Sequence, residues 1–199
     1  LLSPTGTGKT LAFLLPTIAE LDPNEPEIQM LILVPSRELA IQIEQVVREM
    51  GTGYKVNAIY GGRAGAKDKI DLKHRPAILI GTPGRIADHF RRESFAAHAI
   101  KTLVLDEFDK SLEIGFETEM KEILSLLPNV SKRVLTSATQ GLEIPDFVRL
   151  TNAKKIDFLH EGTSQLRVKT VVSPSKDKLE TLVDLLCHLG NQPGIVFCN

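Results

Sequence analysis

The chain has 199 residues, of which 42% are hydrophobic and 25% are charged, and its formal net charge is −1. This length suffices for one complete domain and part of a second, and the near-neutral charge excludes nucleic-acid binding through a broad basic field alone. Met30–Val34, the longest apolar run near the middle, is far too short to cross a bilayer, and no membrane partner is expected. Cys187 and Cys198 are too few for a disulfide framework or a metal cluster, which fits a reducing intracellular, cytoplasmic setting.

Apolar runs of strand length alternate with helix-period stretches along most of the chain. A helix is expected after the opening loop, because Leu11, Leu14, Leu15 and Ile18 recur at helical spacing. A second helix should follow the first strand and end near Gly51. This alternation predicts an α/β domain with a doubly wound, mostly parallel sheet covered by helices on both faces. Strands are expected at residues 28–35, 54–60, 77–82, 100–106 and 132–139.

A change toward polar and flexible residues predicts a linker at residues 159–167. Residues 1–158 would then form the first domain. Residues 168–199 would form a strand-helix-strand unit, with strands at 168–172 and 194–198, which is too small to bury its own sheet face. We therefore expect a second domain that is cut short, and a unit that docks on the first domain, swaps with another copy of the chain, or is poorly ordered.

The stretch Ser3–Thr10, SPTGTGKT, contains the parts of a phosphate-binding loop. Glycines let the chain curl closely enough to aim backbone N–H groups at a ligand, while Lys9 can reach the outer phosphates and Thr10 can offer its hydroxyl to Mg²⁺. The strict pattern requires glycine where this chain has Ser3, so a glycine-rich turn that caps a helix is the alternative. The preceding Leu1–Leu2 is expected to end a buried strand that begins upstream.

Two adjacent carboxylates, Asp106 and Glu107, end another apolar strand. Because ligands of doubly wound sheets sit beyond the carboxyl ends of the strands, the pair should face the same crevice as Lys9 and Thr10. One carboxylate can hold hydrated Mg²⁺, and the next can orient or deprotonate an attacking water. The alternative is that acids at a helix start only favour its dipole.

Six short motifs occur in one order: SPTGTGKT, PSRELA, GG, TPGR, DEFD and SAT. In this order and approximate spacing they resemble the DEAD-box RNA helicases of superfamily 2, from Ser3 past Thr139. GIVFCN at the end resembles the first motif of that family's second RecA-like domain. The resemblance implies a first RecA-like P-loop NTPase domain and the start of a second, truncated at both ends. It also accounts for Ser3, since these helicases typically carry Ala or Ser at that loop position.

The resemblance further implies an ATP hydrolase that couples hydrolysis to local unwinding or remodelling of RNA duplexes and ribonucleoproteins, with ATP and Mg²⁺ as cofactors. Glu107 would be the catalytic carboxylate, acting with Lys9 and Asp106. Thr10 and Asp106 would hold the metal, the latter through water. The nucleotide would contact Thr5, Gly6, Thr7, Gly8, Lys9 and Thr10.

Ser137 and Thr139 of SAT resemble the motif that links hydrolysis to strand separation, by hydrogen bonding to Asp109. Taken without the other motifs, these hydroxyls would cap a turn at an ordinary strand end. The acidic motif itself departs from the family, because Phe108 stands where the family name implies Ala. We expect Phe108 to fill space beneath the following helix, and the sharper hypothesis is that it alters the coupling between hydrolysis and unwinding.

PSRELA, GG and TPGR each follow a predicted strand, so they should share the carboxyl edge of the sheet. Small residues let a nucleic-acid backbone approach main-chain N–H groups, while Arg37 and Arg85 can pair with phosphates. The absence of Trp suits sequence-nonspecific binding through the sugar-phosphate chain of RNA. Taken singly, Arg37 could be a surface residue and Gly61–Gly62 a turn. The RNA-binding set comprises Pro35, Arg37, Gly61, Gly62, Thr82, Pro83, Gly84 and Arg85.

Two other functions stay open. A superfamily 2 DNA helicase or translocase shares the loop and the acidic pair, although PSRELA, TPGR and SAT favour RNA. A nucleotide-dependent RNA-clamping scaffold that does not unwind is compatible with Phe108. The family's adenine-recognising segment and its phosphate-stabilising arginines lie outside these residues, so we expect the fragment to be nearly inactive alone. Protein regulators are further candidate partners. In a eukaryote the location could also be nuclear or nucleolar.

Overall fold

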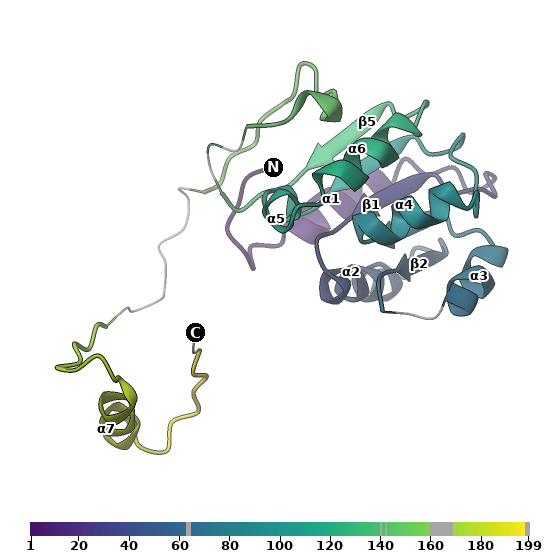
Figure 1. Ribbon diagram of the computed structural model, residues 1–199. Coiled ribbons are helices and arrows are strands. Elements are labelled where there is room, and N and C mark those ends of the chain that lie inside the picture. Colours follow the sequence, from purple (N-terminus) through teal and green to yellow (C-terminus); the bar gives the residue numbers. More distant parts are fainter. Residues whose placement is uncertain (63–64, 140, 142, 160–168, 198–199) are drawn as a thin grey trace. The chain divides into compact units, whose positions relative to one another are not determined.

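A computed structural model describes residues 1–62, 65–139, 141, 143–159 and 169–197. The chain divides into two compact units, Leu1–Gly162 and Thr163–Asn199. The first unit is a parallel sheet with helices on both faces (Figure 1). Within the described ranges, no helix is both long and apolar enough to span a membrane.

The sheet of the first unit has five parallel strands in the order β2-β3-β1-β4-β5. Leu33 at the end of β1 is level with Gly81 of β3 and with Leu105 of β4, so the carboxyl ends of these strands meet at one edge. All five strands that the sequence predicts in this unit are confirmed. Their bounds are β1 Met30–Leu33, β2 Val56–Ile59, β3 Ile78–Gly81, β4 Thr102–Leu105 and β5 Lys132–Leu135.

Alternate side chains of each strand enter two separate cores, which is the consequence of the two-residue period of a strand. Leu31 and Leu33 of β1 pack in one core, and Met30 and Ile32 pack in the other. Both faces of β1 are therefore apolar, as expected for a doubly wound sheet.

Helices α1 and α2 cover one face of the sheet, while α4, α5 and α6 cover the other (Figure 1). Ser36 caps α2 by accepting the N–H of Leu39 at 3.2 Å, and Pro83 occupies the first position of α4. The expected stop of α2 near Gly51 is confirmed. The bounds are α1 Lys9–Ile18, α2 Arg37–Glu49, α3 Gly65–Lys73, α4 Pro83–Arg91, α5 Phe108–Ile114, α6 Glu117–Ser125 and the 3₁₀ helix η1 Asp146–Val148.

Leu1–Leu2 lies in an extended conformation beside the end of β5. Leu2 pairs in parallel with Ser137 on one side and with Asp157 on the other. Its N–H donates to the carbonyl of Ile156 at 2.8 Å, and its own carbonyl accepts from Phe158 at 2.8 Å. These residues are half-buried, and they lead directly into the loop that begins at Ser3.

Phe108 is buried at the start of α5, with 1% of its surface exposed. It belongs to the core formed with α4 and α6. The expectation that Phe108 fills space beneath the helix is therefore confirmed.

The end of β3 allows no side chain at Gly81. A Cβ at this position would lie 2.7 Å from the carbonyl oxygen of Ile59 and 2.7 Å from Cγ1 of Ile86. We expect Gly81→Ala to lower the free energy of unfolding by about 1–3 kcal/mol, because the neighbouring strand and α4 must move apart. The shift of the urea midpoint of this chain measures the effect.

Gly84→Ala is the matched control for Gly81→Ala. Gly84 lies in the first turn of α4, and no other described heavy atom lies within 4 Å of a Cβ built there. Its replacement should leave stability unchanged or raise it by up to about 1 kcal/mol, since glycine is unfavourable in a helix. Equal midpoints for the two variants would contradict the predicted clash.

In the second unit, the described residues contain one helix, α7 Leu179–Leu189. None of the residues of α7 is buried in this part of the chain, and its leucines at 179, 186 and 189 are exposed. The predicted strands are wrong in their described portions, because Lys169–Val172 and Gly194–Phe197 are not in strands. Val168 and Cys198 lie outside the described residues. Two short strands and a helix do not bury enough apolar surface to form a stable sheet.

Candidate active site

Every residue that the sequence predicts for the site lies at the carboxyl edge of the sheet. The strands are all parallel, so the segments that follow them emerge on the same side. The loop Ser3–Gly8 joins this edge because Leu2 pairs beside the end of β5. The edge therefore gathers segments that are distant in sequence into one functional region.

The glycine-rich loop curls around the amine of Lys9. Gly6 and Gly8 have φ values of 81° and 88°, a left-handed conformation that glycine adopts without steric cost. Lys9 Nζ donates to the carbonyls of Ser3 at 2.6 Å and Pro4 at 2.9 Å. Ser3 Oγ and Thr7 Oγ1 are hydrogen-bonded at 2.5 Å. Ser3 therefore takes part in the loop at the position where the strict pattern requires glycine.

The acidic pair lies directly beyond β4. The N–H of Asp106 donates to the carbonyl of Leu33 at 3.0 Å, and 3% of Asp106 is exposed. The Thr136 hydroxyl donates to Oδ1 of Asp106 and accepts the N–H of Glu107 at 3.1 Å. Glu107 has a φ of 47°, which is unfavourable for a residue other than glycine. The surrounding contacts therefore hold Glu107 in a conformation that the local sequence does not favour.

Both carboxyl groups have pKa values above their ordinary range. Burial raises the pKa of Asp106, while the hydrogen bond from Thr136 and the charge of Lys9 partly oppose this effect. Burial and then the charge of Asp106 raise the pKa of Glu107. A carboxylate with a raised pKa is a stronger base, which suits proton abstraction from water.

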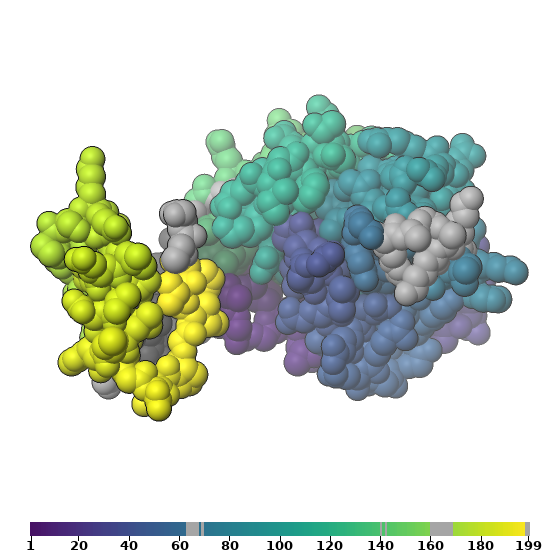
Figure 2. Space-filling view, turned by 60° about the horizontal axis from the view of Figure 1, so that its bottom comes forward, coloured from purple at the N-terminus to yellow at the C-terminus, as the bar shows by residue number. Residues whose placement is uncertain are grey.

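The glycine-rich loop and the acidic pair line one hollow of about 520 Å³. This geometry agrees with the expectation that Lys9 and Thr10 share a crevice with Asp106 and Glu107. Figure 2 shows the purple N-terminal segment next to the blue-violet segment of α2, which contributes the other wall of the hollow. The lining residues are Thr5, Gly6, Gly8, Lys9, Thr10, Leu11, Leu39, Gln42, Val46, Glu49, Met50, Asp106 and Glu107.

Sequence reasoning missed two contributions to this hollow. One is the wall from α2, whose residues Leu39, Gln42, Val46 and Glu49 recur at spacings of one helix face. The other is Thr136, whose hydroxyl contacts both members of the acidic pair. A hydroxyl directly after a strand and next to the SAT motif is the signal that could have drawn attention to Thr136.

The oxygen donors of the hollow fit hydrated Mg²⁺. Thr10 supplies a hydroxyl and Asp106 a carboxylate, and oxygen ligands are those that Mg²⁺ prefers. Among the described residues, no group of three or more His, Cys, Asp or Glu side chains could hold a metal alone.

Asp109 is joined to the segment after β5. Thr139 Oγ1 donates to Asp109 Oδ2 at 2.9 Å, which is the contact expected for the SAT motif. Ser137 Oγ accepts the N–H of Thr139 at 3.1 Å. Burial opposes ionisation of Asp109, but hydrogen bonds from Thr139, Ser137 and the backbone outweigh it and lower the pKa of Asp109. Asp109 is therefore held as a carboxylate that binds these hydroxyls.

The residues predicted to contact RNA lie along the remainder of the carboxyl edge. Arg37, at the start of α2, has 64% of its side chain exposed and pairs with Glu38 at 2.6 Å. Gly61–Gly62 is an exposed turn after β2, and Thr82 occupies the N-cap position of α4. The edge thus presents Arg37 and an exposed glycine turn to solvent.

Arg85 is positioned differently from Arg37, because 17% of its side chain is exposed. Its Nε donates to Oδ2 of Asp68 on α3 at 2.8 Å, and its Nη1 donates to Asp88 at 3.1 Å. Asp68 is buried and also contacts His89 Nε2 at 3.1 Å. Arg85 therefore joins α3 to α4, a contact that spacing in sequence does not reveal.

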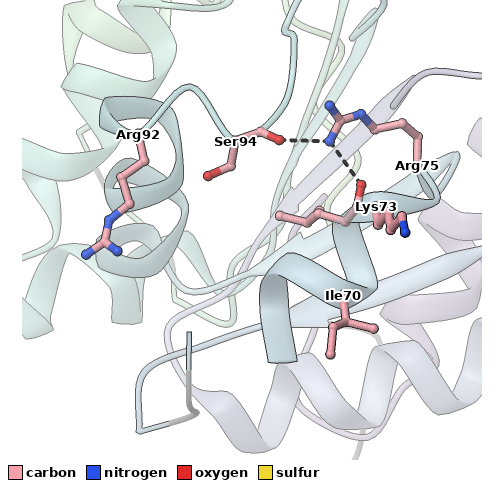
Figure 3. Close-up of a pocket in the computed structure, with 6 residues that line it drawn as sticks. Ile70, Lys73, Arg75, Arg92 and Ser94 are labelled. Carbon is pink, nitrogen blue, oxygen red and sulfur yellow. Dashed lines mark hydrogen bonds between the residues drawn. The ribbon is translucent and has the colours of Figure 1, made fainter. Parts of the chain in front are cut away.

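A second hollow, of about 620 Å³, is lined by residues that differ from the predicted site (Figure 3). Arg75 lines this hollow and donates to the carbonyls of Leu72 at 3.0 Å and Ser94 at 2.8 Å. Arg75 also pairs with Glu27, and Arg92 pairs with Asp88. Both arginines that line this second hollow are therefore already paired within the fold. The lining residues are Ile70, Leu72, Lys73, Arg75, Arg92 and Ser94.

The fold and the arrangement of loop and carboxylates are those of the phosphate-loop class of α/β domains. The family model for DEAD/DEAH box helicases matches residues 1–147, and the chain belongs to this family.

Similar proteins agree with this assignment. The DEAD-box ATP-dependent RNA helicase CshB of Bacillus subtilis (strain 168) is 34% identical over 99% of this chain and 47% of its own length. The ATP-dependent RNA helicase eIF4A of Botryotinia fuckeliana (strain B05.10) is 36% identical over 98% of this chain and 51% of its own length. The chain thus spans about half the length of the curated relatives that it matches.

Two solved structures share the fold. A hypothetical ATP-dependent RNA helicase from Sulfolobus tokodaii has a TM-score of 0.67 and 28% identity, covering 78% of this chain and 46% of the other. A DEAD box protein from Methanococcus jannaschii has a TM-score of 0.64 and 36% identity, covering 70% of this chain and 39% of the other. Both similarities support the α/β fold described above.

Proposed function

We propose that this chain is the nucleotide- and RNA-binding half of an ATP-dependent RNA helicase. The complete protein would couple ATP hydrolysis to local unwinding or remodelling of RNA duplexes and ribonucleoproteins. The observation that carries the proposal is the common hollow lined by Lys9, Thr10, Asp106 and Glu107. A phosphate-binding loop beside two carboxylates has the parts needed to bind a triphosphate and activate water against it.

Within this proposal, the loop residues Thr5–Thr10 cradle the phosphates, and the charge of Lys9 attracts the outermost ones. Thr10 and Asp106 hold Mg²⁺, which when bound neutralises charge on the phosphate oxygens. Glu107 orients the attacking water and accepts its proton, a role favoured by the raised pKa of Glu107. Burial of Asp106 keeps its carboxylate fixed in the hollow.

RNA would bind along the carboxyl edge through its sugar-phosphate chain. Arg37 is exposed enough to pair with a phosphate, and the exposed Gly61–Gly62 turn allows close approach of a strand. Thr82 and the first turn of α4, including Pro83 and Gly84, supply a helix start suited to a phosphate. Arg85 would act mainly by fixing α4 against Asp68, since most of its side chain is enclosed.

One contact supports coupling between the nucleotide site and RNA remodelling. Thr139 binds Asp109, and Asp109 lies three residues beyond the carboxylate proposed to hold Mg²⁺. A change at the acidic pair can therefore be transmitted to the segment after β5.

We further propose that residues 1–158 form the first RecA-like domain, 159–167 a linker, and 168–199 the beginning of the second. The exposed apolar side chains of α7 support this division, because a complete domain would cover them. The fragment alone should hydrolyse ATP barely. We also propose that the protein is intracellular and that protein regulators bind it. Copies of the fragment could exchange their second units by domain swapping.

The proposed function is tested with the full-length protein. Single-stranded RNA is expected to stimulate ATP hydrolysis more than duplex DNA does, and ATP should drive separation of a short RNA duplex. Lys9→Ala serves as the inactive control in both assays. Stimulation by duplex DNA instead of RNA would indicate a DNA translocase, and nucleotide-dependent RNA binding without duplex separation would indicate a clamping scaffold.

A further inference from the structure

Thr136 follows β5 and has none of its surface exposed. Its N–H donates to the carbonyl of Leu105 at 3.0 Å, which continues the pairing of β5 with β4. Its carbonyl accepts the N–H of Phe108 at 3.0 Å. The backbone of Thr136 is therefore tied to residues on both sides of the acidic pair, so its side chain has little freedom to move away from them.

The hydroxyl of Thr136 makes one contact with each member of the acidic pair. Oγ1 donates to Oδ1 of Asp106 and accepts the backbone N–H of Glu107 at 3.1 Å. A hydroxyl can donate one proton and can also accept hydrogen bonds. The Thr136 hydroxyl therefore serves both partners at once, as donor to the Asp106 carboxylate and as acceptor of the Glu107 N–H. A hydrogen bond to an ionised group is stronger and shorter than one between neutral groups.

We propose that Thr136 is a positioning residue for the acidic pair. Its hydroxyl orients the carboxylate of Asp106 for the hydrated Mg²⁺ of a bound nucleotide, and it holds the backbone of Glu107 so that this side chain lines the hollow. The proposal rests on the proposed function of the same site and adds to it a residue outside the motifs that indicated that function.

The backbone of Glu107 supports this role. Its φ of 47° is unfavourable for a residue other than glycine. Such a conformation persists only where neighbouring groups hold it. The hydrogen bond from the Glu107 N–H to Thr136 Oγ1 is one of these contacts. A residue without a side-chain acceptor at position 136 could not make it.

The same segment also reaches the remaining acid of the motif. Thr139, three residues after Thr136, donates to Asp109 at 2.9 Å. One short segment after β5 thus contacts Asp106, Glu107 and Asp109. Thr136 is the member of this segment whose side chain contacts the carboxylate of Asp106 and the backbone of Glu107.

The test compares three variants of the full-length protein. Thr136→Val keeps the approximate shape of the side chain but removes the hydroxyl, while Thr136→Ser keeps the hydroxyl and removes the methyl group. Thr102→Val is the matched control, because Thr102 is also a buried threonine but lies at the amino end of β4, away from the acidic pair. Each variant is measured below its own unfolding midpoint.

The first measurement is the Mg²⁺ concentration needed for half-maximal binding of a fluorescent ADP analogue at equilibrium, and the second is kcat and KM for RNA-stimulated ATP hydrolysis. Thr136→Val is expected to raise the required Mg²⁺ concentration by about 10- to 100-fold and to lower kcat by a similar factor. Both are the usual effect of removing a group that orients a metal ligand. KM at saturating Mg²⁺ should change less. Thr136→Ser and Thr102→Val should stay close to the unsubstituted protein.

Equal Mg²⁺ requirements for Thr136→Val and Thr102→Val would overturn the proposal. Equal losses in Thr136→Val and Thr136→Ser would also overturn it, because the shape of the side chain would then matter and not its hydroxyl. Thr136→Ala replaces the valine variant if that variant does not fold, with the same expected losses. Failure of the proposed function looks different, since the unsubstituted protein itself would then lack RNA-stimulated ATP hydrolysis or ATP-driven separation of an RNA duplex.

Discussion

Lys9→Ala in the full-length protein is expected to lower RNA-stimulated ATP hydrolysis by a factor on the order of 10²–10³, as removal of a directed charge on a reacting group does. Lys9 begins α1 and lines the same hollow as Asp106 and Glu107. Its amine is the positive group of the loop that can offset phosphate charge. Nucleotide affinity should fall as well, because this charge attracts the phosphates before reaction. Steady-state hydrolysis and equilibrium binding of a fluorescent nucleotide measure both effects.

Lys121→Ala is the matched control for Lys9→Ala. Lys121 is an exposed lysine on α6, outside the hollow, so its loss should leave both measurements unchanged. The amine of Lys9 also binds the carbonyls of Ser3 and Pro4, and thermal unfolding therefore has to show that the variant remains folded. A folded Lys9→Ala protein with normal hydrolysis would rule out the assigned role of the loop.

Glu107→Gln should separate binding from hydrolysis. The amide has nearly the shape of the carboxylate but does not accept a proton, so hydrolysis should fall by about 10²–10⁴-fold if Glu107 acts as the general base. Nucleotide binding should be retained or become tighter, because the substitution removes a negative charge that would repel the phosphates. The charge of Asp106 already raises the pKa of Glu107, which shows that the two carboxylates lie close together. Single-turnover hydrolysis and equilibrium binding distinguish the two steps.

Glu113→Gln controls for the loss of an acidic charge near the site. Glu113 lies on α5, the helix that follows Glu107, where it is exposed and pairs with Lys110 at 2.7 Å. Its replacement should leave hydrolysis unchanged. If Glu107→Gln lowered nucleotide affinity as strongly as it lowered hydrolysis, the carboxylate would be a binding group and its assignment as the base would be wrong.

The strands of the first unit could be predicted because their signal is local. A strand buried on both faces is a nearly continuous apolar run, as in Met30–Leu33 and Thr102–Leu105. The same reasoning failed for Lys169–Val172 and Gly194–Phe197, which end in apolar residues but are not in strands. An apolar run becomes a strand only where neighbouring strands supply its hydrogen-bonding partners.

The sequence by itself determined the alternation of strands and helices, the glycine-rich loop and the acidic pair, since each of these depends on residues that are close along the chain. Only the tertiary structure decided that α2 forms a wall of the hollow, that Arg85 is held by Asp68, and that the Thr136 hydroxyl joins both acids. These contacts follow from the strand order β2-β3-β1-β4-β5 and from the packing of helices on the sheet. Periodicity specifies which face of an element is apolar, but the neighbour of a given side chain depends on which distant elements the fold brings beside it.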